Sequence, residues 1–317
     1  MADDLTMTPD AVLIAKAILM LKADVDYVKD YVFPTTLSFF SALLGGVTAY
    51  YVNSRQEKIK AESEKCTAAN SLMMLSFQMV NTLVAIKANY IGMRSQNPIQ
   101  RALAINEILF IAGDVVFDIG RISYIKKIPT QNKSTFERLY SFLRYKILKC
   151  EVVVPTDEEI GKTWRNLARI DAFLFNYNFV LKTLIIRNQL DSEVRAHLSK
   201  VNVLNEPVFE LGLEDIVKEI GAGELSKYID LTENLVALID FLIKEIDSFI
   251  NAFPEIAESN IDLSKTKGAR LVRIVLNKPA YLASLIPIRK PDYKLTSQLV
   301  GMTQEEAEKR YSYSDWY

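Results

Sequence analysis

The chain has 317 residues, half of them hydrophobic, and its mean hydropathy of +0.08 is high for a fully soluble protein. Its 38 Lys and Arg residues nearly balance 39 Asp and Glu residues, so no net positive field attracts phosphates and we expect no nucleic-acid partner. Cys66 and Cys150 are the only cysteines, which excludes a disulfide framework and predicts buried thiols in a reducing compartment. Glycine and proline are scarce, at 11 and 10 residues, which favours an all-α fold.

An amphipathic helix is expected within residues 1–32. Thr8 is a suitable N-cap, and Pro9 suits the first helical position. Apolar residues then recur alternately four and three positions apart: Ile14, Ile18, Leu21, Val25, Val28 and Val32. This heptad spacing is typical of a coiled coil and predicts a short helical assembly that leads into the next segment. A core helix and a helix lying in the membrane interface are the alternatives.

Residues 33–52, FPTTLSFFSALLGGVTAYYV, contain no charge over 20 positions. As a helix this run is about 30 Å long, which matches the hydrocarbon thickness of a bilayer. Pro34 lies in the first turn, where a helix tolerates proline, and Tyr50 and Tyr51 lie where aromatic rings favour the headgroup layer. We therefore predict a single transmembrane helix. A buried core helix is the alternative, because two threonines and a glycine pair dilute the hydrophobicity.

The basic residues around this run predict its orientation. Only Lys22 and Lys29 precede it within reach, whereas four basic residues follow it: Arg55, Lys58, Lys60 and Lys65. The positive-inside rule then places the C-terminal body in the cytoplasm, beside an inner or plasma membrane that the chain crosses once. A secretory signal fits poorly, because acidic residues rather than basic ones dominate the start of the chain.

One face of the predicted span carries small side chains. Ser41, Gly45 and Ala49 recur every four residues, and Ala42 and Gly46 lie beside them. Small residues at this spacing let a second helix approach closely. We therefore expect the span to self-associate and the protein to form a homo-oligomer, with a monomeric span as the alternative.

Residues 53–67 form a charged juxtamembrane segment. The stretch SRQEKIKAESEK has no helix breaker, and Glu57 with Lys60 and Glu62 with Lys65 have helical spacing. We expect the membrane helix to continue through this segment as a solvated rod, until the following residues provide an apolar face to pack.

Residues 68–253 are expected to form a cytoplasmic multi-helix bundle. Proline, glycine and polar clusters divide this region at 128–134, 152–159 and 205–223, and another break is expected near Pro254. The predicted helices are 68–95, 99–127, 134–150, 157–200 with a bend, and 224–253. Capping boxes mark helix starts at Ser134 to Glu137, Thr156 to Glu159 and Thr303 to Glu306.

Residues 254–317 differ in character, because Pro279, Pro287 and Pro291 divide short apolar pieces that cannot form long helices. We expect this segment to wrap over the bundle. It has a local excess of basic residues, which are candidates for contact with anionic lipid headgroups or a nucleotide phosphate: Arg270, Arg273, Lys278, Arg289 and Lys290. A solvated surface is the alternative for these residues.

Motifs for catalysis and metal ligation are missing from the sequence. His197 is the only histidine, which excludes two-histidine metal sites, and we expect it on a helix surface. Patterns of the P-loop, G-x-G-x-x-G and G-x-S-x-G types are also absent from the sequence. Glu107, Asp114 and Asp118 share a predicted helix and are the one route to acid–base chemistry. Ion pairs are the preferred interpretation of these acids, with Arg101, Arg121 or Lys126.

We therefore expect no enzyme, no metal and no cofactor. Asn176 and Asn178 could line a small-ligand pocket, but their alternating faces favour simple packing. The expected partners are the lipid bilayer, further copies of the chain, and a protein or ligand bound to the cytoplasmic body.

The arrangement of residues 33–95, a span joined through a charged helix to a helical body, resembles the small membrane effectors of bacterial antiviral defence. The resemblance implies a non-enzymatic effector whose body senses a partner or ligand and controls self-association of the span, and through it membrane integrity. Two other classes stay open. One is a membrane-tethered scaffold or adaptor that binds other proteins, and the other is a soluble helical ligand-binding protein or enzyme with 33–52 as a core helix.

Overall fold

The computed structural model describes residues 8–21, 28–110, 113–128, 155–200, 213–266 and 268–313. Within these ranges every regular element is a helix, which confirms the predicted all-α class. In chain order the elements are α1 (Pro9–Leu21), η1 (Val28–Val32), α2 (Phe33–Ala88), α3 (Pro98–Ala104), η2 (Ile119–Ile122), α5 (Asp157–Gly161), α6 (Leu167–Lys200), α7 (Leu213–Ile220), α8 (Ala222–Glu258), η6 (Leu263–Lys265), α9 (Pro279–Ser284), α10 (Tyr293–Val300) and α11 (Gln304–Arg310). The chain divides into two compact units, Met1–Lys60 and Ala61–Tyr317.

The first unit consists of α1, the short π-helix η1 and the first part of α2. The backbone carbonyl of Thr8 accepts hydrogen bonds from the amides of Ala11 and Val12, at 2.9 and 3.2 Å, so α1 begins where the sequence predicts. From Phe33 onward the backbone is helical without interruption as far as Ala88. The apolar run, the charged segment and the first helix of the body are therefore one helix, as expected from the absence of a breaker.

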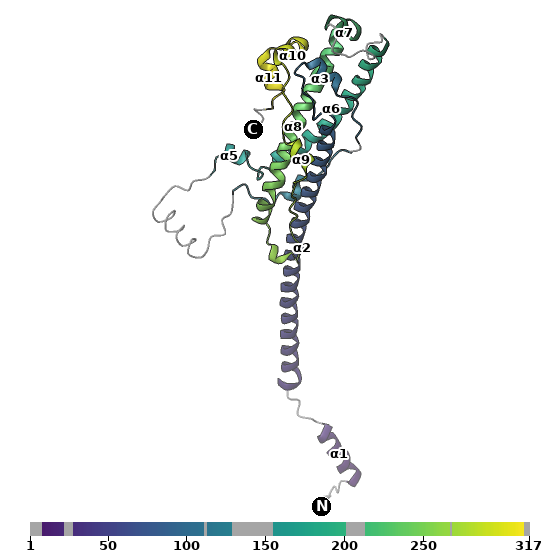
Figure 1. Cartoon of the computed structure of the whole chain (residues 1–317). Helices are drawn as coiled ribbons and strands as arrows, with labels where there is room; N and C mark the ends of the chain where they lie inside the picture. The colour runs from purple at the N-terminus through teal and green to yellow at the C-terminus, as the bar shows by residue number, and fades with distance from the viewer. Residues whose placement is uncertain are drawn as a thin grey trace, which may run out of the picture. The chain divides into compact units, whose positions relative to one another are not determined.

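The second unit is a bundle in which the second part of α2, α6 and α8 lie side by side (Figure 1) and share one hydrophobic core. Buried positions on α2 recur three and four residues apart, which gives this part of the helix a continuous apolar stripe. They are Cys66, Ala68, Ala69, Leu72, Met73, Ser76, Met79, Val80, Leu83, Ile86 and Lys87. The predicted burial of Cys66 is thus confirmed, whereas Cys150 lies outside the described residues.

Two predicted helix ends are wrong. The helix expected over 68–95 stops at Ala88, where the Asn89 side chain donates to the carbonyls of Ala85 and Ile86 and so satisfies the last turn. The break expected near Pro254 does not occur, since α8 continues to Glu258 with this proline inside it. A proline removes one backbone hydrogen bond, but the buried side chains of Phe253 and Ala257 hold the last turn against the core.

The predicted helix 99–127 is the largest error, because α3 ends at Ala104 and the described residues 105–110 and 113–118 are not helical. Two asparagines on α6 take over the backbone bonding of this segment. The Asn178 side chain accepts from the amide of Val115 and donates to its carbonyl, both at 2.8 Å. Asn188 does the same for Ile108, at 3.2 and 2.9 Å. Asn178 therefore has the structural role that was predicted over a ligand pocket, and that role is to bind the backbone of Val115.

A third asparagine binds an extended segment in a similar way, through the backbone of two residues instead of one. Asn70 of α2 donates to the carbonyl of Arg270 at 2.9 Å and accepts from the amide of Val272 at 2.8 Å. In each of these three pairings an amide side chain replaces the partner strand that an extended segment would otherwise need.

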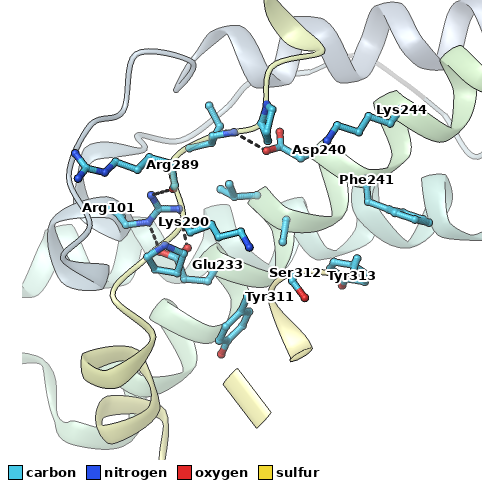
Figure 2. A pocket seen from close by; sticks show the side chains of 15 residues that line it. Arg101, Glu233, Asp240, Phe241, Lys244, Arg289, Lys290, Tyr311, Ser312 and Tyr313 are labelled. Carbon is cyan, nitrogen blue, oxygen red and sulfur yellow. Dashed lines mark hydrogen bonds and ion pairs between the residues drawn. The ribbon is translucent and has the colours of Figure 1, made fainter. Parts of the chain in front are cut away.

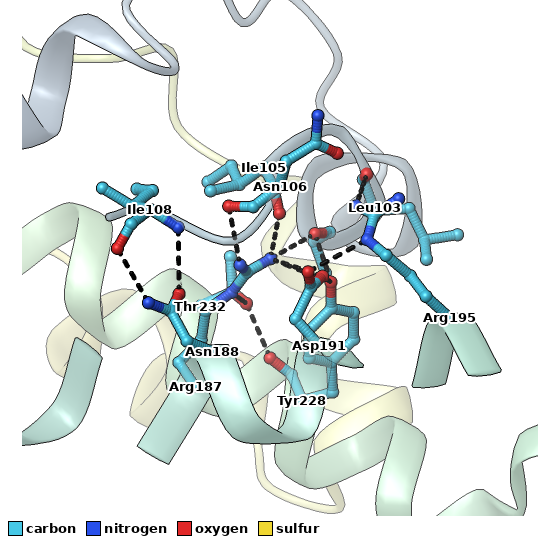
Figure 3. A network of polar contacts seen from close by, with 11 residues as sticks. Leu103, Ile105, Asn106, Ile108, Arg187, Asn188, Asp191, Arg195, Tyr228 and Thr232 are labelled. Carbon is cyan, nitrogen blue, oxygen red and sulfur yellow. Dashed lines mark hydrogen bonds and ion pairs between the residues drawn. The ribbon is translucent and has the colours of Figure 1, made fainter. Parts of the chain in front are cut away.

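The end of α3 is held by a buried polar network (Figure 3). The guanidinium of Arg187 on α6 donates to the carbonyls of Ala102, at 2.7 Å, and Asn106, at 3.2 Å. Asp191 pairs with Arg187 at 3.3 Å and accepts from the Tyr228 hydroxyl of α8. Burial lowers the pKa of Arg187, yet the guanidinium stays protonated and caps the unsatisfied carbonyls of α3.

The other predicted helix starts and breaks are described in part. The capping boxes at Thr156 and Thr303 are both present, with each side chain bonded to the amide three residues later. The bend expected within 157–200 is a break between α5 and α6. The helix predicted at 134–150 and the capping box at Ser134 lie outside the described residues.

The asparagine pairings give a testable prediction. Asn178→Ala should lower the free energy of unfolding by roughly 1–3 kcal/mol, because both backbone groups of Val115 lose their partner. Urea unfolding followed by circular dichroism measures the change, and hydrogen exchange at the Val115 amide should accelerate. Asn81→Ala, at an exposed position of α2, is the control and should change neither quantity. Equal effects of the two substitutions would contradict the assignment.

Candidate functional site

The first candidate site is the outer surface of residues 33–52. All twenty residues are exposed, and helix α2 is long and apolar enough to cross a membrane. Large apolar side chains such as Phe40 and Leu44 are 59% and 65% exposed. Soluble proteins rarely expose a continuous apolar surface of this size to water, and such surfaces mark contact with a membrane or with another protein. A Cβ atom added at Gly45 or Gly46 meets nothing within 4 Å, so the stripe of Ser41, Gly45 and Ala49 is open to a second helix.

The second candidate site is a cleft of about 310 Å³ on the helical body, between α8 and the C-terminal segment (Figure 2). One wall is a face of α8 on which lining residues recur at helical spacing: Glu233, Val236, Ala237, Asp240, Phe241 and Lys244. The second wall is the extended segment 287–291, and the third is the turn 311–313 that follows α11.

The second wall is fixed by its backbone. The amide of Ile288 donates to Asp240 at 2.7 Å, and the carbonyl of Arg289 accepts from Arg101 at 2.6 Å. Pro287 and Pro291 bracket this stretch, and a proline favours extended backbone in the residue before it. Since successive side chains of an extended segment point to opposite sides, Arg289 reaches Gln96 at 3.0 Å while Lys290 turns toward the cleft.

Two buried cations hold the cleft together from behind. The side chains of Arg101 and Glu233 are each 1% exposed and form a bidentate pair, with nitrogen–oxygen distances of 2.7 and 2.8 Å. Lys87 of α2 pairs with Asp240 at 2.6 Å and donates to the carbonyls of Ser284 and Ile286, both at 2.7 Å. The cleft wall is therefore tied directly to α2.

The third wall is built on aromatic side chains. Tyr311 donates its hydroxyl to Asp230 at 2.7 Å, and Tyr313 donates to Asn234. The rings of Tyr313 and Phe241 stack, with centroids 5.7 Å apart. Burial raises the pKa of Tyr313 to about 12, so this phenol is neutral at physiological pH.

Charge in the cleft is unbalanced toward positive. Burial raises the pKa of Glu233 while Arg101 opposes that shift, and Asp240 is already paired with Lys87. Lys244 and Lys290 also line the cleft, and in the described part of the chain both are exposed and no ion pair joins either of them to a carboxylate.

The structure separates the predicted basic residues. Arg289 and Lys290 line the cleft, whereas Arg273 pairs with Glu258 at 2.8 Å and Lys278 is the exposed N-cap residue of α9. The Arg270 backbone carbonyl is bound by the asparagine of α2 described above, and its side chain is exposed. Lys244 was not predicted, because nothing in the spacing of α8 distinguishes a cleft lysine from a solvated one.

The three acids Glu107, Asp114 and Asp118 do not share a helix, although the sequence predicts that they do. Asp114 pairs with Lys182 at 3.4 Å, and Asp118 caps η2 through the amide of Gly120 at 2.9 Å. These partners differ from the predicted ones, because the residues lie on extended chain instead of one helix face. Among the described residues, no three His, Cys, Asp or Glu side chains are grouped so that they could hold a metal ion. His197 is exposed near the end of α6, as predicted.

Comparison of the chain with protein-family models, curated proteins and solved structures gave no match in any of the three.

The pair behind the cleft gives a second prediction. Arg101→Met should destabilise the protein by roughly 3–5 kcal/mol, because Glu233 is left buried without a partner. The double variant Arg101→Met, Glu233→Met should recover part of this loss, since no uncompensated charge is then buried. Urea unfolding measures both.

Arg310→Met is the matched control, because its pair with Asp230 is 48% and 23% exposed and should contribute below about 1 kcal/mol. A double variant as unstable as, or less stable than, Arg101→Met would show that the two side chains act independently.

Proposed function

We propose that this protein is a membrane-anchored, non-enzymatic helical effector. Residues 33–52 cross the membrane once, the body lies in the cytoplasm, and the state of the body controls self-association of the span. The output is clustering of spans and, through it, a change in membrane integrity, as in the antiviral-defence effectors that residues 33–95 resemble.

One observation carries this proposal. A single uninterrupted helix, α2, contains an exposed, uncharged run of bilayer length and also the buried stripe of the body's core. If the run were the core helix of a soluble protein, one side of it would be buried, as Leu72, Met79 and Leu83 are further along the same helix. Exposure of the whole run favours lipid or another copy of the span as its partner.

The same helix offers a route for signalling. Lys87 on α2 is ion-paired with Asp240, which lines the cleft, and it also holds two carbonyls of the C-terminal segment. A change that separates α8 from residues 287–291 therefore alters the bonding of α2 itself. A rigid helix transmits such a change as a rotation or displacement along its axis.

Membrane attachment is tested by fractionation. The full chain should stay with membranes that are washed in alkaline carbonate, whereas a chain of residues 54–317 should be released or soluble, because it lacks the uncharged run. Release of the full chain by carbonate without detergent would contradict the membrane anchor.

Self-association is tested by the glycine pair. Gly45→Leu with Gly46→Leu should reduce crosslinked oligomers in membranes several-fold and suppress dye leakage from vesicles that contain the protein, because larger side chains keep the helices apart. Val47→Leu adds bulk on the opposite face and is the control, for which both readouts should stay at the wild-type level. Unchanged crosslinking in the double variant would rule out packing through the small residues.

A membrane-tethered scaffold is the second candidate, and exposed apolar side chains on the body favour it. Leu109 and Val116 are both 87% exposed, and Phe175 of α6 is 68% exposed. A scaffold should tolerate replacement of residues 33–52 by an unrelated span of equal length, whereas the effector should lose clustering and leakage.

A further inference from the structure

We propose that the cleft between α8 and residues 287–291 binds a small molecule that carries a phosphate group, with Lys244 and Lys290 contacting the phosphate. The binding itself is a property of the body alone. Its role as the signal that controls the span rests on the function proposed above.

The two lysines are the first argument. Lys244 reaches the cleft from α8 and Lys290 from the extended wall, so the ammonium groups approach from two separate elements (Figure 2). Lysine binds phosphate as a point charge and needs no planar geometry. Two exposed cations lining one hollow repel each other, and a bound anion removes that repulsion.

The second argument is that the carboxylates of the cleft are already neutralised. Arg101 holds Glu233 in a bidentate pair, and Lys87 holds Asp240, which also accepts from a backbone amide. Neither acid can therefore pair with the lysines without breaking a buried interaction. The positive charge at the mouth of the cleft is available to a ligand.

The volume of the cleft and its apolar lining indicate what the rest of the ligand is like. A volume of about 310 Å³ lies at the small end of ligand pockets, so the occupant is a small molecule or a headgroup instead of a folded partner. The floor is apolar, with Val236, Ala237 and Ile288 beside the stacked rings of Phe241 and Tyr313. A flat apolar group joined to phosphate, as in a nucleotide, matches this combination.

The backbone of Tyr313 supports the same conclusion. Its φ of 50° is the one positive value among the non-glycine residues that the structure describes. A bulky residue adopts this conformation at an energetic cost, and the hydrogen bond to Asn234 and the stack on Phe241 hold it there. The effect is to keep an aromatic ring at the edge of the cleft.

Phosphate can reach this cleft from a soluble molecule or from a lipid headgroup, and calorimetry on the full chain in dodecyl maltoside distinguishes them. The probes are ATP, inorganic pyrophosphate, adenosine, and dihexanoyl phosphatidylglycerol with dihexanoyl phosphatidylcholine as its control. ATP and pyrophosphate should bind with one site per chain, and adenosine should bind far more weakly because it lacks phosphate. Binding of the phosphatidylglycerol probe without binding of ATP would support the same site with lipid as the source.

Variants assign the binding to the cleft. Lys244→Ala and Lys290→Ala should each weaken binding about tenfold or more, since each removes a charge-assisted contact. Lys290→Arg keeps the charge and should retain most of the affinity. Lys278→Ala is the matched control, an exposed lysine of the same basic segment outside the cleft. The alanine variants should unfold at the wild-type temperature, because neither lysine holds an ion pair in the described part of the chain.

The inference is overturned if no probe binds at millimolar concentration, or if binding is the same in wild type, Lys244→Ala and Lys290→Ala. The glycine variants of the span should bind the probe normally, which separates the two proposals. If no probe binds but crosslinking still depends on the glycines, the ligand site is wrong and the span mechanism stands. If binding depends on the two lysines but crosslinking is unchanged in the glycine variants, the span mechanism is wrong and the ligand site stands.

Discussion

The structure of the body depends on one constraint, that buried backbone amides and carbonyls must be hydrogen-bonded. The non-helical segments meet it through side chains on helices instead of strand partners. Asn178, Asn188 and Asn70 each bind an amide and a carbonyl of an extended segment. Long cationic side chains do the same for lone carbonyls. Arg101 and Lys87 reach the C-terminal segment in this way, so helical faces determine where the loops run.

The same interactions divide the polar residues of the body into two groups. Those committed to buried pairs and carbonyls, such as Arg187 and Glu233, fix the fold, and removing one partner leaves the other without compensation. Lys244 and Lys290 belong to the second group, because they line a hollow and hold no carboxylate in the described part of the chain. This contrast within one small region is the basis for the proposal that the cleft binds a ligand.

Helix α2 joins the two proposals. Residues 33–52 of this helix have an uncharged surface exposed on every side, and its second part has the single apolar stripe of a core helix. Lys87 lies on that stripe and binds both the cleft and the C-terminal segment. In the two proposals, ligand binding and span assembly are connected by one helix and one ion pair, and the substitutions described above separate the two events.

The sequence by itself determined the features that are encoded locally. Helical class, the continuity of α2, the capping boxes at Thr156 and Thr303 and the burial of Cys66 all follow from the spacing and type of neighbouring residues. The sequence also picked out Arg289 and Lys290 as candidate anion contacts, because proline and positive charge concentrate around them, and both line the cleft.

Only the tertiary structure decided the rest, since the partners are far apart in the chain. The described residues 105–110 and 113–118 are not helical, and there the side chain of Asn178 meets the backbone of Val115 across 63 positions. Likewise, Arg101 reaches the carbonyl of Arg289 across 188 positions, and this contact forms a wall of the cleft. Helical periodicity reports which face of a segment is apolar, but it carries no information about which distant segment will pack there.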